Sequence, residues 1–312
     1  MSAISIPTQQ RSWLPYVALS LAVVLFSWGA IFVRLAQAQG MPSLAIAAIR
    51  YSAATLILTP YILSRERAAL RRLSRRDIVL NILAGMLLAT AIVMVFSALE
   101  HTTILIANVI NNSQPLWVAV MEVLILGAAL GRRVWIGLAL ALAGTILFTL
   151  AGIEDLSAMG SNPLLGGGLA LASALIASLY LIVGRAVRSR VPTLVFMWIS
   201  LLSGSVLTLS ISFASGIPLL GYPAAGYLWT LAITFTGQLI GHSLIAFCLA
   251  HLPATLVSIS NQVVVVLSAV LAFLIFNETP GPLQILASGV ILSGVMVTIL
   301  HRPGRGAGWL RH

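Results

Sequence analysis

Charge is the scarcest property of this sequence. Only 8% of its 312 residues are charged, whereas 60% are hydrophobic. A soluble globular domain carries roughly 25% charged residues. The chain therefore has too little polar material to cover a water-exposed surface. This shortage excludes a soluble protein and predicts that the surrounding solvent is lipid.

The sequence contains one cysteine and no lysine. A single thiol, Cys248, lies inside an apolar run and cannot form an internal disulfide, and no Cys/His spacing typical of zinc occurs. All 17 basic residues are arginines, grouped in short clusters between apolar runs. Such clusters hold loops in the cytoplasm, whereas nucleic-acid binding needs a basic face on a soluble module. We therefore predict no metal, no cofactor and no nucleic-acid partner.

Ten stretches are long enough to cross a bilayer, for which a helix needs about 20 mostly apolar residues. They are 14–35, 43–64, 78–98, 102–127, 133–152, 164–186, 192–216, 226–249, 252–276 and 281–301. This pattern predicts an all-α integral membrane protein of ten transmembrane helices, in contact with membrane lipid along its length.

The arginines also predict the orientation. With the N-terminus inside, every arginine except Arg34 and Arg50 falls in a cytoplasmic segment. An odd number of helices would place the C-terminal arginines outside, against the positive-inside rule. We therefore expect both termini in the cytoplasm and a multi-pass location in the inner (plasma) membrane.

The chain contains an internal repeat. A shift of 150 residues pairs polar and glycine positions of the two halves: His101 with His251, Asn111 with Asn261, Asn112 with Gln262, Gly131 with Gly281, and Gly144 with Gly294. Each half holds five helices, an odd number, so the second half enters the membrane from the opposite side. This inverted duplication is typical of secondary transporters, and it predicts two units, 14–152 and 164–301.

Polar side chains inside the spans indicate a candidate cavity, because such groups in lipid face partners or water. Asn108, Asn111 and Asn112 share one face of the fourth span with Pro115, and Ser258, Asn261 and Gln262 share one face of the ninth. Both groups lie near the membrane midplane. The remaining predicted substrate-binding residues are Gln238, His242, Ser27, Trp28 and Tyr180. The alternative is that these groups only bond neighbouring helices.

Two charges and three bending residues complete the pattern. Arg50 is interpreted as an anchor near the outer interface, with binding of a substrate carboxylate as the alternative. Glu122, late in the fourth span, is interpreted as an interfacial or inter-helix partner, with proton coupling as the alternative. Pro115 removes a backbone bond in mid-helix, and with Gly237 and Gly241 it is a candidate hinge.

This architecture resembles the ten-helix, EamA-type branch of the drug/metabolite transporter superfamily over about residues 14–301. The resemblance rests on the duplication, on Trp28-Gly29, on Arg50 early in the second span, and on the repeat endings. The second ending has Asn277-Glu278 before its glycine-spaced helix, whereas the first keeps Gly137 and Gly144 but lacks the glutamate. Within the family the chain is most similar to the YddG-type exporters of aromatic and other amino acids.

The resemblance implies a secondary transporter that exports small metabolites, amino acids first, by alternating access around a central cavity. Transport of another metabolite or of drugs is the alternative, with a channel, a scaffold or an intramembrane enzyme as weaker ones. No His-Glu-x-x-His or Gly-x-Ser-x-Gly motif occurs, so we expect no enzyme. The first span carries no acid, which favours facilitated efflux over proton-coupled antiport. A monomer is compatible with the sequence, which sets no oligomeric state.

Overall fold

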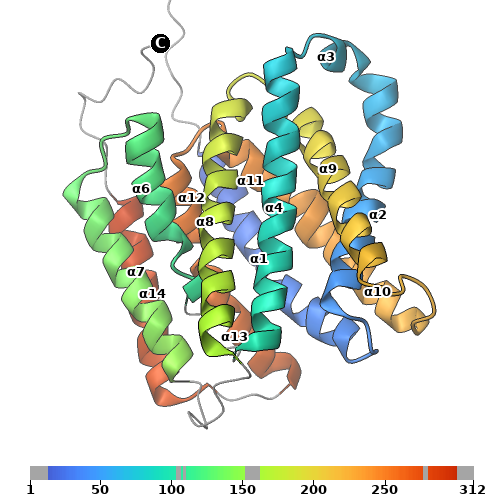
Figure 1. The fold of residues 1–312 in the computed structure, drawn as a ribbon. Helices are drawn as coiled ribbons and strands as arrows, with labels where there is room; N and C mark the ends of the chain where they lie inside the picture. Colours follow the sequence, from blue (N-terminus) through green and yellow to red (C-terminus); the bar gives the residue numbers. More distant parts are fainter. Residues whose placement is uncertain (1–12, 103–106, 108–109, 152–161, 277–279, 301–312) are drawn as a thin grey trace, which may run out of the picture.

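The computed structural model describes residues 13–102, 107, 110–151, 162–276 and 280–300 as a bundle of helices (Figure 1). The helices are α1 Leu14–Gln37, α2 Ser43–Arg65, α3 Arg67–Arg71, α4 Arg75–His101, α6 Gln114–Leu126, α7 Arg132–Leu150, α8 Pro163–Arg188, α9 Thr193–Ala214, α10 Ala224–Ile233, the π-helical segment η1 Thr234–Gly241, α11 His242–Leu249, α12 Ala254–Ser260, α13 Val263–Phe276 and α14 Pro282–Ile299.

The helices are built for a membrane. Within the described residues, nine helical stretches are long and apolar enough to cross one, and the apolar helix α6 is shorter. The α10–η1–α11 and α12–α13 series each count as one of these stretches. Large side chains such as Leu56 and Phe213 are more than 70% exposed in the middle or at the end of a span, which suits a lipid surface. The count of ten complete spans stays a prediction.

Turn residues define the helix ends, and they repeat in the two halves. Pro42 precedes α2 and its counterpart Pro192 precedes α9, both in extended backbone. Gly131 and Gly281 occupy the same position before α7 and α14. Proline lacks a backbone N–H and is therefore tolerated at a helix start. Its ring also clashes with the preceding residue, which disfavours helix there. The 150-residue shift thus pairs positions with the same structural role.

The fourth and ninth predicted spans are interrupted rather than continuous. Turns at Asn112–Ser113 precede α6, and turns at Asn261–Gln262 separate α12 from α13. At both places backbone N–H groups bond three residues back, as in Gln262 N to Ile259 O (3.0 Å). Asparagine side chains compete with the helical backbone and favour turns, which a count of apolar residues does not reveal. The sequence pattern did not predict these two interruptions.

Pro115 is also placed differently from the prediction. It lies in the first turn of α6, where its missing N–H costs no intrahelical bond. It therefore starts a helix and does not kink one in mid-span. The first predicted asparagine, Asn108, lies outside the described residues.

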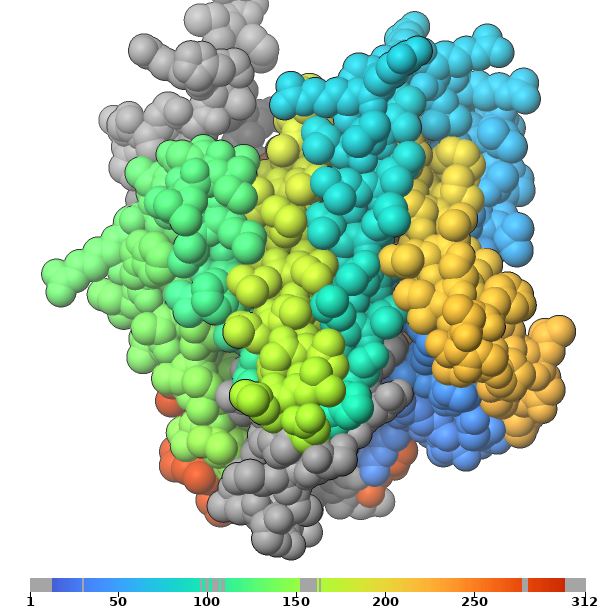
Figure 2. All heavy atoms as spheres, in the orientation of Figure 1, coloured from blue at the N-terminus to red at the C-terminus, as the bar shows by residue number. Residues whose placement is uncertain are grey.

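Helix pairing reflects the repeat. Helices α2 and α9, equivalent under the 150-residue shift, pack antiparallel, since Ser52 Oγ meets Ser205 Oγ at 2.8 Å and Trp198 donates to Thr59 Oγ1 at 2.8 Å. Likewise α7 packs on its counterpart α14. Helix α4 packs on α8, and the equivalent α10–α11 series packs on α1. Figure 2 shows α8 between the α6–α7 region and α4 on one face.

Glycines let α7 and α14 approach closely. A Cβ on Gly294 would lie 2.5 Å from Ala141 N and 2.6 Å from Gly137 O, both backbone atoms of α7. Small residues permit such contacts in membranes, where packing and not the hydrophobic effect holds helices together. The pair is therefore a tight unit that tolerates no side chain at this crossing.

We predict that Gly294→Ala destabilises the protein by about 1–3 kcal/mol, because backbone must move to admit the methyl group. Gly289→Ala, in the same helix with open space around it, is the matched control and should change stability by no more than about 0.5 kcal/mol. Thermal unfolding of the detergent-solubilised variants measures both. Equal midpoints for the two variants would contradict the close crossing.

Candidate functional site

A cavity of about 290 Å³ lies inside the bundle between α1, α2, α4 and the α10–η1–α11 series. Its polar lining consists of Arg50 from α2, Gln238 from η1 and His242 from the start of α11. The cavity occupies the half of the bundle toward the end of α1, since it is lined by Phe26, Gly29 and Val33, whereas Pro15 at the start of α1 contacts the end of α11. Three of its residues thus carry polar groups deep in a membrane protein.

Several atoms of these polar groups accept or donate no hydrogen bond among the described residues. Arg50 Nε, both amide atoms of Gln238 and His242 Nδ1 are buried and have no hydrogen-bond partner among the described residues. The hydroxyl of Tyr51 is a close neighbour of Arg50 and Gln238, but no hydrogen bond of standard geometry joins them. A buried polar group without a partner is costly. The cluster is therefore a candidate site for a polar ligand.

The rest of the wall is apolar and aromatic. Phe26 stands edge-on to the His242 ring, with the ring centroids 5.0 Å apart, and Ile92 and Ile233 complete the lining. Gly241 meets the same phenylalanine, since a Cβ there would lie 2.9 Å from Phe26 Cε1. A few polar groups converging in an apolar pocket are typical of small-molecule sites.

Sequence reasoning found part of this lining. Gln238, His242 and Gly237 were predicted as cavity or hinge residues, and all three line the cavity. Arg50 was interpreted first as an anchor, and its place in the lining favours the carboxylate-binding alternative. Phe26 and Ile92 were missed, because an apolar residue in a span carries no signal of its own.

The predicted carboxamides of the two halves meet elsewhere. Gln262 Nε2 donates to the backbone oxygen of Asn112 at 2.9 Å, which joins the two helix interruptions. Asn261 Oδ1 and Ser258 Oγ are buried without a partner among the described residues, and Asn111 is half-buried. None of these side chains is in the lining of the Arg50 cavity. The contact between Gln262 and Asn112 thus joins the two repeats outside the Arg50 cavity.

Three other predicted substrate-binding residues make contacts within the protein, outside the cavity lining. Ser27 Oγ donates to Val24 O at 2.6 Å, and Ser27 O accepts from Ser268 Oγ at 3.0 Å. Trp28 stacks on Phe32 at 5.8 Å between ring centroids. Tyr180 belongs to the main buried core. None of the three belongs to the lining of the Arg50 cavity.

At the opposite end of the bundle, a buried carboxylate joins three helices. Glu122 of α6 is fully buried and accepts hydrogen bonds from Ala254 N (3.0 Å), Thr255 N (2.8 Å) and Thr255 Oγ1 (2.5 Å). Arg185 of α8 forms an ion pair with it at 3.0 Å and also donates to Leu252 O at 2.6 Å. Glu122 therefore caps the N-terminus of α12 and joins α6, α8 and α12. We name Glu122, Arg185 and Thr255 the carboxylate latch.

A neighbouring arginine, Arg188, also bonds backbone and side-chain groups at this end of the bundle. Arg188 of α8 donates to Ala246 O at 2.8 Å and to Val191 O and Thr193 Oγ1. In the described part of the chain, no group of three or more His, Cys, Asp or Glu side chains could hold a metal ion. The charged residues here serve helix connections.

Comparison with known proteins identifies the architecture. A model of the EamA-like transporter family matches residues 14–150 and 164–300. A solved structure described as "Crystal structure of protein" aligns with a TM-score of 0.80 at 20% sequence identity, and the alignment covers 92% of this chain and 96% of that chain. At this identity the structural likeness speaks for the fold alone. No curated protein matches the chain.

We predict that Glu122→Ala destabilises the protein by about 3 kcal/mol, because it leaves Arg185 and the first N–H groups of α12 without their acceptor. The control is Asp77→Asn, which removes an ion pair to the half-exposed Arg190 at 3.4 Å and should cost no more than about 1 kcal/mol. Thermal unfolding in detergent measures both changes. If the two substitutions cost the same, the latch does not hold the three helices together.

Proposed function

Because the chain belongs to the EamA-like transporter family of the drug/metabolite transporter superfamily, with two repeats, we propose that it exports amino acids, aromatic and neutral ones above all, as a secondary carrier. The observation that carries the substrate class is the Arg50 cavity. Arg50 belongs to a membrane-spanning helix, and the Gln238 amide and the His242 imidazole line the same cavity as its guanidinium.

The cavity offers matching groups for an amino acid. An arginine within a membrane span is expensive and usually marks a binding path. Its N–H groups suit the two oxygens of a carboxylate. The amide oxygen of Gln238 and an imidazole nitrogen of His242 supply acceptors for an ammonium group. Phe26, Ile92 and Ile233 provide the apolar wall that an aromatic or aliphatic side chain needs.

Charge and size argue against the alternative substrates. The acids whose side chains are described are Glu66, Asp77 and Glu122, and none lines the cavity. A cationic drug would therefore meet the positive charge of Arg50 without a counter-charge. At about 290 Å³ the cavity is also at the lower end of the roughly 300–1,000 Å³ typical of ligand pockets, which disfavours a nucleotide sugar.

The carboxylate latch supports alternating access. It closes the end of the bundle where α1 begins, whereas the Arg50 cavity lies toward the other end. The 150-residue shift pairs Glu122 with Ala272 and Arg185 with Leu35, so the positions equivalent to this ion pair carry no charge in the other repeat. We infer that the resting carrier is closed on the latch side, and that opening this side for export requires the latch to separate.

Hinges fit the same scheme. Gly237 and Gly241 lie in η1, and π-helical segments are frequent at functional sites. The interruptions at Asn112 and Asn261 provide further bending points, with Pro115 at the start of α6. The side chains of Asn111, Asn261 and Gln262 would then meet the substrate once the latch side opens.

The membrane arrangement is part of the proposal. Ten spans with both termini in the cytoplasm of an inner-membrane protein satisfy the positive-inside rule. The two inverted units would cover 14–152 and 164–301. With this orientation the carboxylate latch lies on the cytoplasmic side and the Arg50 cavity toward the outside.

We predict that Arg50→Gln weakens amino-acid binding by about 3 kcal/mol, or roughly a hundredfold in affinity, because the carboxylate loses its charged partner. Arg50→Lys should retain part of the flux, since the charge remains but the paired N–H geometry does not. Uptake of radiolabelled amino acids into proteoliposomes measures the effect. Arg133→Gln, at the exposed start of α7, is the control, and equal flux in all variants would refute the site.

A second prediction concerns the substrate. Amino-acid methyl esters, which lack the carboxylate, should compete roughly a hundredfold more weakly than the parent amino acids in wild-type proteoliposomes. Because no described acid lines the cavity and His242 acts as a neutral acceptor in the proposed recognition, an imposed pH gradient should leave the flux unchanged. Equal competition by the esters, or flux that follows the pH gradient, would contradict the proposed recognition or coupling.

A further inference from the structure

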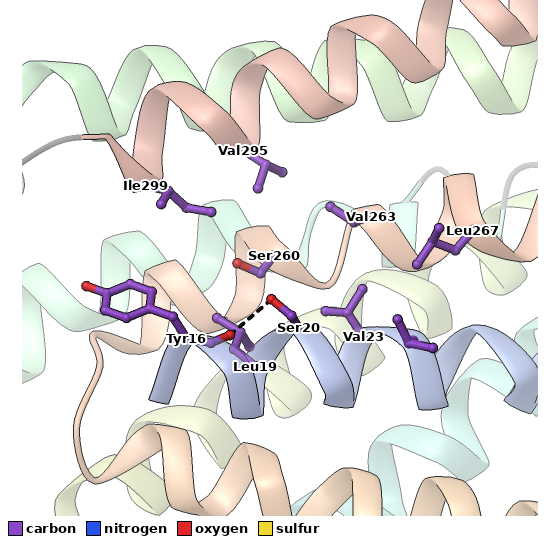
Figure 3. A pocket seen from close by; sticks show the side chains of 10 residues that line it. Tyr16, Leu19, Ser20, Val23, Ser260, Val263, Leu267, Val295 and Ile299 are labelled. Carbon is purple, nitrogen blue, oxygen red and sulfur yellow. Dashed lines mark hydrogen bonds between the residues drawn. The ribbon is translucent and has the colours of Figure 1, made fainter. Parts of the chain in front are cut away.

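A second cavity, of about 350 Å³, lies between α1, the α12–α13 junction and α14. Figure 3 shows side chains of α1, including Leu19 and Val23, on one side of this space and Val295 and Ile299 of α14 on the other, with Val263 between them. It is distinct from the Arg50 cavity, with which it shares no lining residue. We name it the α1–α14 cavity.

The lining excludes a polar occupant. It is almost entirely aliphatic, and the hydroxyl of Ser20 is already bonded to Tyr16 O at 3.0 Å. Ser260 Oγ is the one buried polar atom of the lining that lacks a partner in the described chain. An ordered water needs two to four polar partners, which this space does not offer. A hydrocarbon chain fits it.

The mouth of the cavity faces the lipid. Tyr16 and Ile299 are 47% and 41% exposed, and both lie within candidate membrane spans. Both residues lie at the end of a span, and the lining extends from there along Val23 and Leu267 toward the middle of the spans, where acyl chains surround the protein. Tyrosine is also enriched at membrane interfaces, where its ring is buried and its hydroxyl stays wet.

The cavity lies where the bundle is weakly joined. Helix α14 packs closely along α7, whereas its contacts with α12 and α13 are few. The α1–α14 cavity therefore separates the α7–α14 pair from the rest of the molecule. An empty space of this size would forfeit dispersion contacts on every side.

Charge indicates the headgroup. Tyr16 and Ile299 line the same cavity, so the start of α1 and the end of α14 are neighbours. In the sequence, Arg11 precedes α1 and Arg302 and Arg305 follow α14. Basic residues beside a membrane span attract anionic lipid headgroups.

From these observations we propose that the α1–α14 cavity binds one acyl chain of an anionic phospholipid, which fills the gap between α1 and α14 and braces the α7–α14 pair. This proposal does not depend on the substrate of the carrier. It predicts a specific lipid site on a surface that otherwise faces bulk lipid.

The test uses the full chain purified in detergent and delipidated, with phosphatidylglycerol or phosphatidylcholine of the same acyl chains added back. Native mass spectrometry counts bound lipid, and thermal unfolding measures stability. We expect one retained phosphatidylglycerol and a midpoint raised by several degrees, with a smaller shift for phosphatidylcholine. No retained lipid and no shift would overturn the site, and equal shifts would overturn the preference for an anionic headgroup.

Filling the cavity provides the matched comparison. Val295→Trp places a ring in the space, whereas Leu292→Trp adds the same ring to the exposed face of α14. The lipid-dependent shift should vanish in the first variant and persist in the second. Val23→Trp, which fills the cavity from α1, repeats the test if Val295→Trp does not fold. Lipid retention in both cavity-filling variants equal to that of Leu292→Trp would place the lipid elsewhere.

Discussion

The absence of water inside a bilayer constrains every part of this molecule. Each backbone or side-chain polar group in the hydrocarbon region must find its partner within the protein. This requirement explains why the interrupted helices are tolerated. The N–H groups that begin α12 are received by Glu122, and the Gln262 amide bonds the backbone oxygen of Asn112. The start of α12 and the interruption at Asn112 are thus each compensated by a group from the other half.

The same constraint separates scaffold from site. Glu122 is fully buried and its carboxylate accepts from four donors, so its charge holds α6, α8 and α12 together. Arg50 is also inside the bundle, yet its Nε and the neighbouring Gln238 amide are buried without partners. A group that is costly to bury and is left unsatisfied is where a ligand gains most by binding. The contrast between these two charges distinguishes the Arg50 cavity as the candidate site more sharply than the count of polar residues does.

The sequence sufficed for the membrane class, the repeat and many helix ends, because these depend on local chemistry. Pro42 and Pro192, or Gly131 and Gly281, carry their turn preference wherever they stand. Gln238 and His242 were also found, since polar residues contrast with an apolar span. The breaks at Asn112 and Asn261 were missed because hydropathy averages over them. Phe26 and the Ala254–Thr255 partners of Glu122 depend on contacts between distant segments, which no local pattern records.

The one-sided placement of Glu122 and Arg185 has a thermodynamic consequence. An ion pair that stabilises one conformation slows its departure and raises its population, whether or not cargo is bound. By microscopic reversibility it cannot favour outward over inward movement, because every route passes the same barrier in both directions. In the uncoupled carrier proposed above, the net direction is therefore set by the concentration ratio of the transported solute across the membrane. In that proposal, the divergence of the halves at Ala272 and Leu35 gives the carrier a preferred resting state, which sets the compartment that it samples first.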